Sequence, residues 1–282
     1  VTPATVLRQA GVAGLDFIPS DNTDKIPGTE AKLTGPQHLV VVKDTAGLAK
    51  EILFSEPDAE AVRQLDLTTG IIDTALQTYA LNFSRGEGLI GIVPLDYDAS
   101  LSLPYGVAAK GNHNGGVETL YTASYGTGEV RKTDLTTGIT VPLAGRRNTG
   151  FLPVADYGEG DGSEALKAQL FGPADVALDE DLKLLYIAEM DSGRVRRVDL
   201  VTGIISSVAG SLPLPGESLR LYGLTLDPLR QVLYASAPDE HVVFKFNLEA
   251  QPCTAPEGIA RAGTPSCAEG PTVNINYCTA QC

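Results

Sequence analysis

The sequence predicts an all-β fold, a β-propeller built of four-stranded antiparallel blades, and three observations lead to it. First, GEVRKTDLTTGITVPLAG at 128–145 is repeated as GRVRRVDLVTGIISSVAG at 193–210, and AEAVRQLDLTTGIID at 59–73 is a third copy. Second, each copy consists of short β-branched runs separated by Gly, Asp and Thr, which is the pattern of strands and turns. Third, a small sheet of this kind cannot bury both faces alone, so repeated sheets are expected to stack around an axis.

Four modules can be aligned on an apolar–aromatic pair. The separation from the aromatic residue to the closing Asp or Asn is thirteen residues in the last three modules and twelve in the first. Modules of fixed spacing joined by loops of unequal length are typical of propeller blades. The aligned pairs are Leu53-Phe54, Leu120-Tyr121, Leu185-Tyr186 and Leu233-Tyr234.

Each module contains four predicted strands in the same order. The first strand follows a Pro or Gly, the second contains the aligned pair, the third precedes a turn, and the fourth follows a Gly. Consecutive strands joined by short turns form an antiparallel meander. SEALKAQL at 163–170 is expected to form one helical turn within a connection. The strands are expected at 35–42, 51–56, 61–67 and 70–76; at 103–109, 118–123, 129–135 and 138–145; at 171–178, 183–188, 194–200 and 203–210; and at 221–226, 231–236, 242–248 and 258–263.

The motifs of these strands resemble those of the NHL-repeat family of β-propellers. They run Gly-Pro-x-hydrophobic, Leu-Tyr-x-Ala, Val-Arg-x-x-Asp, Thr-Gly-Ile and Val-Ala-Gly, and GDGSEALKAQLFGP at 160–173 is similar to the lead-in of that family. The third module matches best, whereas Phe244 replaces the arginine in the fourth. The resemblance covers the chain to about residue 270 and implies the fold. It implies no single function, because the family includes ligand-binding domains, enzymes and scaffolds.

The two ends of the chain depart from the repeat. ATVLRQAG at 4–11 looks like a fourth strand without its own first three, so residues 1–11 are predicted to be an orphan outer strand. Blades are expected at 12–263 and a Cys-containing tail at 264–282. Four blades are visible, whereas propellers of the resembling family usually close with about six. The chain is therefore a segment of a larger ring, an unusual four-bladed ring, or an open ring completed by another chain through its unpaired strand.

The charge of the chain excludes some partners. Its formal net charge is −14 at pH 7. A nucleic-acid partner would require a basic stripe that displaces counterions, so none is expected. No apolar run reaches the length of about 18 residues needed to span a bilayer, so membrane insertion is not predicted either.

The cysteines favour an extracellular or cell-surface setting. All four lie in the last 30 residues, in a segment rich in Pro, Thr and Ala. This distribution favours disulfides of a secreted protein over a zinc site, which would show paired C-x2-C spacing or a nearby His; the connectivity stays open. The sequon at Asn82 is a candidate glycosylation site in the same setting. The cysteines are Cys253, Cys267, Cys278 and Cys282.

Residues that recur in every module are expected to hold the module together, whereas residues that differ can carry function. Three arginines recur at one register, each beside a recurring Asp three positions later. Such arginines are expected to pack their stems between blades with their heads paired. They are Arg63, Arg131 and Arg196.

Strand alternation predicts which loops share a face. The loops between second and third strands lie on the same face as the blade-to-blade connections, of which 78–102 and 146–170 are long. Loops mounted on a rigid ring are where binding residues are usually found. The candidate binding face consists of Glu56, Asp58, Tyr125, Glu189, Asp191, Asp239, Glu240 and His241.

The sequence shows no catalytic constellation. It has no G-x-S-x-G and no H-E-x-x-H motif, and the predicted strands place His38, His113 and His241 too far apart to meet at one metal. No cofactor is predicted, with Ca²⁺ on the acidic loops as the open alternative. The sequence thus favours a non-enzymatic extracellular propeller that contacts proteins, including copies of itself, or glycans, or that builds an assembly such as a strand-exchanged filament. The alternative is a metal-dependent hydrolase or lyase of the six-bladed propeller type that uses the acidic loop face.

Overall fold

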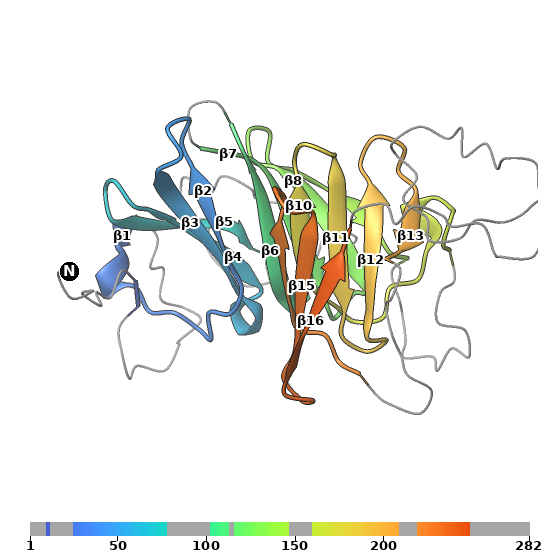
Figure 1. Cartoon of the computed structure of the whole chain (residues 1–282). Helices are drawn as coiled ribbons and strands as arrows, with labels where there is room; N and C mark the ends of the chain where they lie inside the picture. Colours follow the sequence, from blue (N-terminus) through green and yellow to red (C-terminus); the bar gives the residue numbers. More distant parts are fainter. Residues whose placement is uncertain are drawn as a thin grey trace, which may run out of the picture.

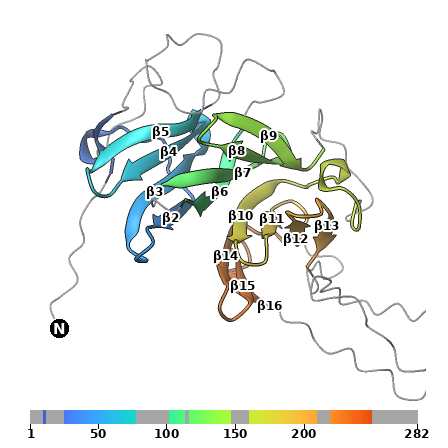
Figure 2. The same cartoon turned by 90° about the horizontal axis from the view of Figure 1, so that it is seen from above.

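The computed structural model describes residues 10–11, 25–77, 102–112, 116–146, 160–208 and 219–248. These residues form four antiparallel sheets arranged as the blades of a β-propeller (Figure 1). We number these sheets blades 1 to 4 in chain order. Seen from above, the blades follow one another around an arc, with the sheet that begins at residue 26 (blade 1) at one end and the sheet that begins at residue 223 (blade 4) at the other (Figure 2). The prediction of an all-β propeller is confirmed. The described residues contain no helix that is long and apolar enough to cross a membrane.

Fifteen of the described strands overlap the predicted ranges, and within each blade these strands pair in sequence order. Blade 1 carries an additional short strand, β1, on the outer edge of β5. The 3-10 turn Ala165–Lys167 is the helical turn expected before blade 3. The strands are β1 (Ile26–Pro27), β2 (Leu39–Lys43), β3 (Ala49–Glu56), β4 (Ala61–Asp66) and β5 (Ile71–Gln77) in blade 1; β6 (Pro104–Gly111), β7 (Val117–Ser124), β8 (Glu129–Asp134) and β9 (Ile139–Ala144) in blade 2; β10 (Pro173–Asp179), β11 (Leu184–Glu189), β12 (Arg194–Asp199) and β13 (Ile205–Ser207) in blade 3; and β14 (Gly223–Asp227), β15 (Val232–Ala237) and β16 (Val242–Asn247) in blade 4.

The strand register corrects the alignment of the first module. The recurring arginine of the third strand pairs with Phe54 in blade 1, with Thr122 in blade 2 and with Ile187 in blade 3. Phe54 is therefore one position beyond the register of the aligned tyrosines, and Leu53 is their equivalent in blade 1. With Leu53 in that place, the separation to Asp66 is thirteen residues, as in the other blades.

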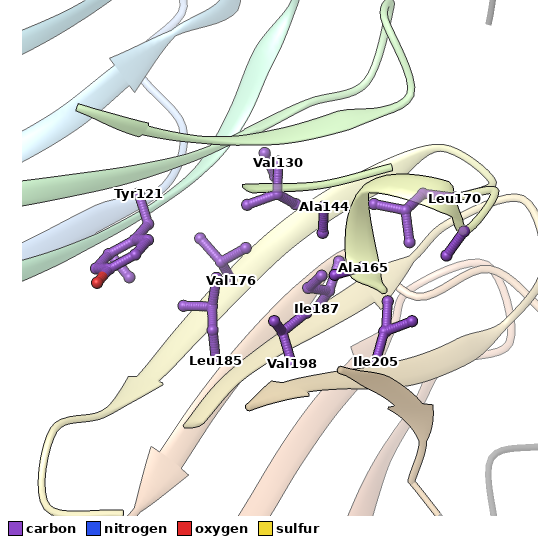
Figure 3. Packing of buried hydrophobic residues seen from close by; sticks show 13 residues of the cluster. Tyr121, Val130, Ala144, Ala165, Leu170, Val176, Leu185, Ile187, Val198 and Ile205 are labelled. Atoms are coloured by element: carbon purple, nitrogen blue, oxygen red, sulfur yellow. The ribbon is translucent and has the colours of Figure 1, made fainter. Parts of the chain in front are cut away.

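Each blade packs one face against its neighbour. The cluster between blades 2 and 3 contains Tyr121 and Val130 from one sheet and Leu185 and Ile187 from the other (Figure 3). The same pairing of faces recurs between blades 1 and 2 and between blades 3 and 4. We call the two faces of a blade its Tyr side and its Leu side. The Tyr side carries Leu53, Tyr121, Tyr186 or Tyr234, and the Leu side carries Ile52, Leu120, Leu185 or Leu233.

The recurring Asp at the end of the third strand shapes the next turn. In blade 2, Asp134 Oδ1 accepts hydrogen bonds from the backbone N–H groups of Thr136 at 2.8 Å and Thr137 at 3.0 Å. These backbone donors lower the pKa of the Asp134 carboxyl. Gly138 completes the turn at a φ of 72°, which favours glycine. The same side-chain-to-backbone bonds form in blades 1 and 3.

Four equivalent positions meet at the propeller axis, namely His38, Gly106, Asp175 and Gly223. His38 Nδ1 lies 3.0 Å from Asp175 Oδ2, so blade 1 is tied to blade 3. The same carboxylate oxygen accepts the backbone N–H of Leu224, in blade 4, at 2.7 Å. Blade 2 approaches closely because a Cβ on Gly106 would lie only 2.3 Å from the Cα of Asp175. Asp175 is thus a buried hub that contacts all four blades.

Some predictions concern residues outside the described parts of the chain. They include the glycosylation site at Asn82, His113, the fourth strand of blade 4 at 258–263 and most of the orphan strand at 4–11. The proposed domain limits, which also rest on such residues, stay predictions. The cysteines in this group are Cys253, Cys267, Cys278 and Cys282.

Candidate functional site

The face that carries the loops between second and third strands presents a compact cluster of aromatic and charged side chains. Its members come from blades 2, 3 and 4, and they lie in these loops or at or just before the start of the innermost strands. Such positions are held by the strands on either side, so the side chains are presented from a rigid frame. We call this group the tyrosine cluster. It consists of Tyr105, Tyr125, Asp191, Arg220, Tyr222 and Asp239.

Two tyrosines from blade 2 form one end of the tyrosine cluster. The rings of Tyr105 and Tyr125 meet edge to face, with centroids 5.4 Å apart and planes at 81°. The Tyr125 hydroxyl donates a hydrogen bond to Asp191 Oδ1 at 3.4 Å, which links blade 2 to blade 3. A Cβ on Gly172 would lie 2.5 Å from Asp191 Oδ2 and 2.8 Å from the Tyr125 ring, so this glycine permits the close approach.

Arg220 lies at the centre of the tyrosine cluster, between two carboxylates. Its guanidinium nitrogens are 3.8 Å from Asp191 Oδ1 and 3.7 Å from Asp239 Oδ2. The guanidinium carbon lies 5.5 Å from the centroid of the Tyr222 ring, within reach of a cation–π interaction. One nitrogen also contacts Met190 Sδ at 3.0 Å. The Arg220 side chain is 39% exposed, so its charge faces solvent while its stem packs on the protein.

The charges of the tyrosine cluster act on its hydroxyls. Burial raises the pKa of the Tyr125 hydroxyl, and the Asp191 carboxylate raises it further, while Arg220 opposes them. Burial likewise raises the pKa of Tyr222, with Arg220 lowering it and Asp239 raising it. Both hydroxyls stay protonated at physiological pH and are donated to Asp191 and Asp239, so their oxygens and ring faces are what they offer to a ligand.

Three of the predicted face residues lie in the tyrosine cluster, and three others lie on the surface outside it. Tyr125, Asp191 and Asp239 are the members that the sequence analysis selected. Asp58, Glu240 and His241 are exposed. Their part in binding stays a prediction.

Glu56 and Glu189 lie inside the protein, which differs from the expectation that they face solvent. They are 1% and 0% exposed. Glu56 Oε2 lies 3.5 Å from an Arg63 guanidinium nitrogen, and its other oxygen accepts the backbone N–H of Thr34. The sequence analysis assigned these glutamates to the loops of the binding face, but they are the last residues of β3 and β11. Their side chains are buried and pair with the recurring arginines Arg63 and Arg196.

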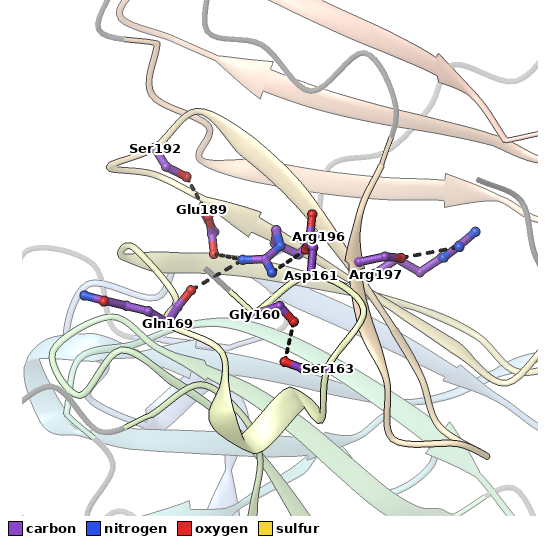
Figure 4. Close-up of polar contacts among 9 residues, drawn as sticks. Gly160, Asp161, Ser163, Gln169, Glu189, Ser192, Arg196 and Arg197 are labelled. Atoms are coloured by element: carbon purple, nitrogen blue, oxygen red, sulfur yellow. Dashed lines mark hydrogen bonds and ion pairs between the residues drawn. The ribbon is translucent and has the colours of Figure 1, made fainter. Parts of the chain in front are cut away.

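Arg196 shows how such a pair is buried (Figure 4). Its guanidinium is fully buried and lies 3.4 Å from Glu189 Oε1 and 2.6 Å from Asp161 Oδ1. It also donates to the backbone oxygen of Gln169 at 3.4 Å, and the Ser192 hydroxyl donates to Glu189 at 2.5 Å. Burial raises the pKa of Glu189, against the opposing charge of Arg196. The arginines are thus framework residues, as expected, with the strand-end carboxylates as partners.

Sequence reasoning missed Tyr105, Arg220 and Tyr222. A signal for two of them was present, because the Tyr-Gly pair recurs at the start of the innermost strand in both blade 2 and blade 4. These tyrosines are followed by Gly106 and Gly223, two of the four positions at the axis. Arg220 had no such signal, since it lies in a connection that the repeat does not constrain.

No metal centre is evident in the described part of the chain. Among those residues, no group of three or more His, Cys, Asp or Glu side chains is arranged to hold an ion. In the tyrosine cluster, the two carboxylates face a guanidinium rather than each other. The arrangement can hold polar and planar groups by hydrogen bonds and ring contacts.

The chain resembles known proteins in its fold and not in its sequence. No protein-family model and no curated protein sequence matches the chain. Among solved structures, it is similar to a chain in the crystal structure of a nidogen/laminin complex, at 11% identity and a TM-score of 0.49, covering 78% of this chain and 62% of that one. It is also similar to selenomethionine-substituted virginiamycin B lyase from Staphylococcus aureus, at 13% identity and a TM-score of 0.40, covering 79% of this chain and 58% of that one. The chain therefore spans less than two thirds of the length of each.

Proposed function

We propose that this chain is a non-enzymatic, NHL-like propeller that acts outside the cell as a protein-interaction module. The observation that carries the proposal is the tyrosine cluster, in which Arg220 and Tyr222 are presented together on the face that bears the loops. The cysteine-rich tail and the sequon at Asn82 support the extracellular setting.

The composition of the tyrosine cluster is that of a binding hot spot. Tyr and Arg are enriched among the residues that dominate the affinity of protein interfaces. Tyr125 and Tyr222 each offer a ring face and a hydroxyl at a low cost in conformational entropy, because a tyrosine has few rotatable bonds. Asp191 and Asp239 hold Arg220 in place before a partner arrives, and such pre-organisation lowers the cost of binding.

A selection experiment tests this proposal. The immobilised wild-type chain is used to select binders from a displayed library of secreted protein domains, and each binder is then titrated against Arg220→Ala and Tyr222→Ala. Truncation of a hot-spot residue raises Kd by about tenfold or more. The matched control is Arg230→Ala, an exposed arginine in the loop between β14 and β15, paired with Asp227 and outside the tyrosine cluster.

The result that contradicts the proposal is equally specific. Binders that tolerate both cluster substitutions, or that lose as much affinity with Arg230→Ala, would show that the tyrosine cluster is not the contact surface. A glycan array probed with the same variants distinguishes the other ligand class. Glycan binding that requires Tyr222, without any protein binder, would replace a protein partner by a sugar.

A further inference from the structure

Within the described part of the chain, no sheet covers the Tyr side of blade 4, although its residues match those that other blades bury. Val243 is 69% exposed, whereas the equivalent Val130 and Val195 are both 0% exposed. Tyr234 is 36% exposed, while the equivalent tyrosines of blades 2 and 3 are at most 4% exposed. The equivalence follows from the strand register, which pairs these positions identically in each blade. Blade 4 therefore carries the surface that receives a following blade.

At the other end of the arc, the opposite kind of face, the Leu side of blade 1, is only partly covered. Leu39 on β2 is 62% exposed, whereas the equivalent Val107 and Val176 in blades 2 and 3 are 4% and 3% exposed. Val41, two positions along the same strand, is 40% exposed. The outer part of this face is covered, because a segment that includes Ala31 packs against its buried residues. The inner part is the surface that a preceding blade would cover.

These two end faces are the unmatched halves of one kind of interface. Inside the chain, a Tyr side meets a Leu side three times, and none of the described hydrophobic clusters joins blade 4 to blade 1. The two blades stand at opposite ends of the arc in Figure 2. They approach at the axis, where Asp175 binds both His38 and the backbone of Leu224. A fifth blade inserted at the axis would have to break both contacts, so a partner must approach the end faces from outside.

We propose that the occupant is a second copy of this chain, bound head to tail. The Tyr side of blade 4 in one copy, with Tyr234 and Val243, packs on the Leu side of blade 1 in the next copy, with Leu39 and Val41. The contact repeats the pairing that already stabilises the three interfaces within the chain, and it covers apolar side chains that are otherwise left in water. It is heterologous, so it propagates into a chain of molecules or closes into a ring. This inference is independent of the tyrosine cluster, whose residues take no part in it.

Capping variants test the proposal. Val243→Arg blocks one end face and Leu39→Arg blocks the other, and both sites are solvent-exposed, so the substitutions leave the monomer folded. Analytical ultracentrifugation of the wild-type chain is expected to show mass that increases with concentration. Each capped variant alone is expected to associate about tenfold or more weakly than the wild type, so it stays monomeric at concentrations at which the wild type associates. A mixture of the two variants is expected to form a discrete 1:1 dimer, because one intact face remains on each copy.

The control is Val201→Arg, which places the same charge at a 78% exposed valine in the turn between β12 and β13, away from both end faces. It is expected to associate like the wild type. A wild-type chain that stays monomeric at every concentration would overturn the proposal, whether or not the variants fold. So would Val201→Arg blocking association as strongly as Val243→Arg, or a mixture of capped variants that fails to dimerise. Protection of Val243 from hydroxyl-radical labelling in a monomer would instead show that the chain covers this face itself.

Discussion

His38 Nδ1 and Asp175 Oδ2 lie 3.0 Å apart at the propeller axis and join blade 1 to the blade opposite to it. The two residues occupy equivalent positions in their blades, and the corresponding positions in blades 2 and 4 are glycines. Because Gly106 and Gly223 have no side chain, the innermost strands of blades 2 and 4 can lie close to the Asp175 carboxylate that binds His38. Blades 1 and 4, which share no hydrophobic cluster in the described structure, are thereby held at the centre.

The stability of the propeller is predicted to depend on the protonation of His38. Burial, the largest single influence, lowers the pKa of His38, but the hydrogen bond and charge of Asp175 together raise it above its usual 6.5. A raised pKa in the folded state means that the stabilisation is complete below about pH 6.5 and is lost as the pH rises through the folded-state pKa. Urea unfolding of the wild type between about pH 6 and pH 9 is expected to show this loss.

The variant His38→Ala tests the assignment of that pH dependence. It is expected to lose about 1.5–3 kcal/mol of unfolding free energy at low pH, as for a hydrogen bond to a charged group, and to flatten the pH profile in this window. His241→Ala, which removes an exposed histidine from a loop, is the matched control and should leave the profile unchanged. A profile of His38→Ala that parallels the wild type would assign the pH dependence to another group.

Gly106 is predicted to tolerate no side chain. The Cβ of an alanine at this position would lie 2.3 Å from the Cα of Asp175 and 2.7 Å from the backbone oxygen of Ala174, so backbone would have to move. Gly106→Ala is expected to cost about 2 kcal/mol or more in chemical unfolding. Gly111→Ala, in the same strand, is the matched control, because its Cβ would meet the Val42 side chain at an ordinary 3.4 Å. Equal losses for the two variants would refute close packing at the axis.

The buried Arg196–Glu189 pair is predicted to be replaceable only as a unit. Arg196→Ala leaves Glu189 buried without its principal partner and is expected to cost about 3–5 kcal/mol in the free energy of unfolding. Blade 4 carries Phe244 and Ala237 at the equivalent positions. The double variant Arg196→Phe with Glu189→Ala is therefore expected to be more stable than Arg196→Ala alone. If the double variant is the less stable of the two, an unpaired buried Glu189 costs less than the replacement of both residues by Phe and Ala, which contradicts the prediction.

The tyrosine cluster is predicted to show coupled ionisation. Asp191→Asn removes the negative charge that raises the pKa of Tyr125, so this pKa is expected to fall. Arg220→Ala removes a positive charge that lowers the pKa values of both Tyr125 and Tyr222, so both are expected to rise. Ultraviolet titration of each variant, with Tyr125→Phe to assign the signal, measures the shifts. Shifts of the opposite sign would contradict the contacts in the tyrosine cluster.

Local chemistry explains which parts of the fold could be predicted. A strand of alternating apolar residues and a turn of the Asp-x-x-x-Gly kind depend on neighbours along the chain, so their repetition predicts each blade. The same alternation placed Tyr125, Asp191 and Asp239 on one face before their contacts were known. The first module was misaligned by one residue, because Phe54 resembles the tyrosines while Leu53 occupies their register.

The sequence by itself determined the blades, their strand order and the face on which the loops gather, since these follow from periodicity and turn chemistry. Only the tertiary structure decided that Glu56 and Glu189 are buried beside arginines. The residues around a strand-end glutamate are the same in sequence whether its side chain faces water or a neighbouring blade. The tertiary structure also decided that Arg220 joins the tyrosine cluster, and that His38 meets Asp175. These contacts join residues that are far apart in the chain, and their distances are set by how whole blades stack.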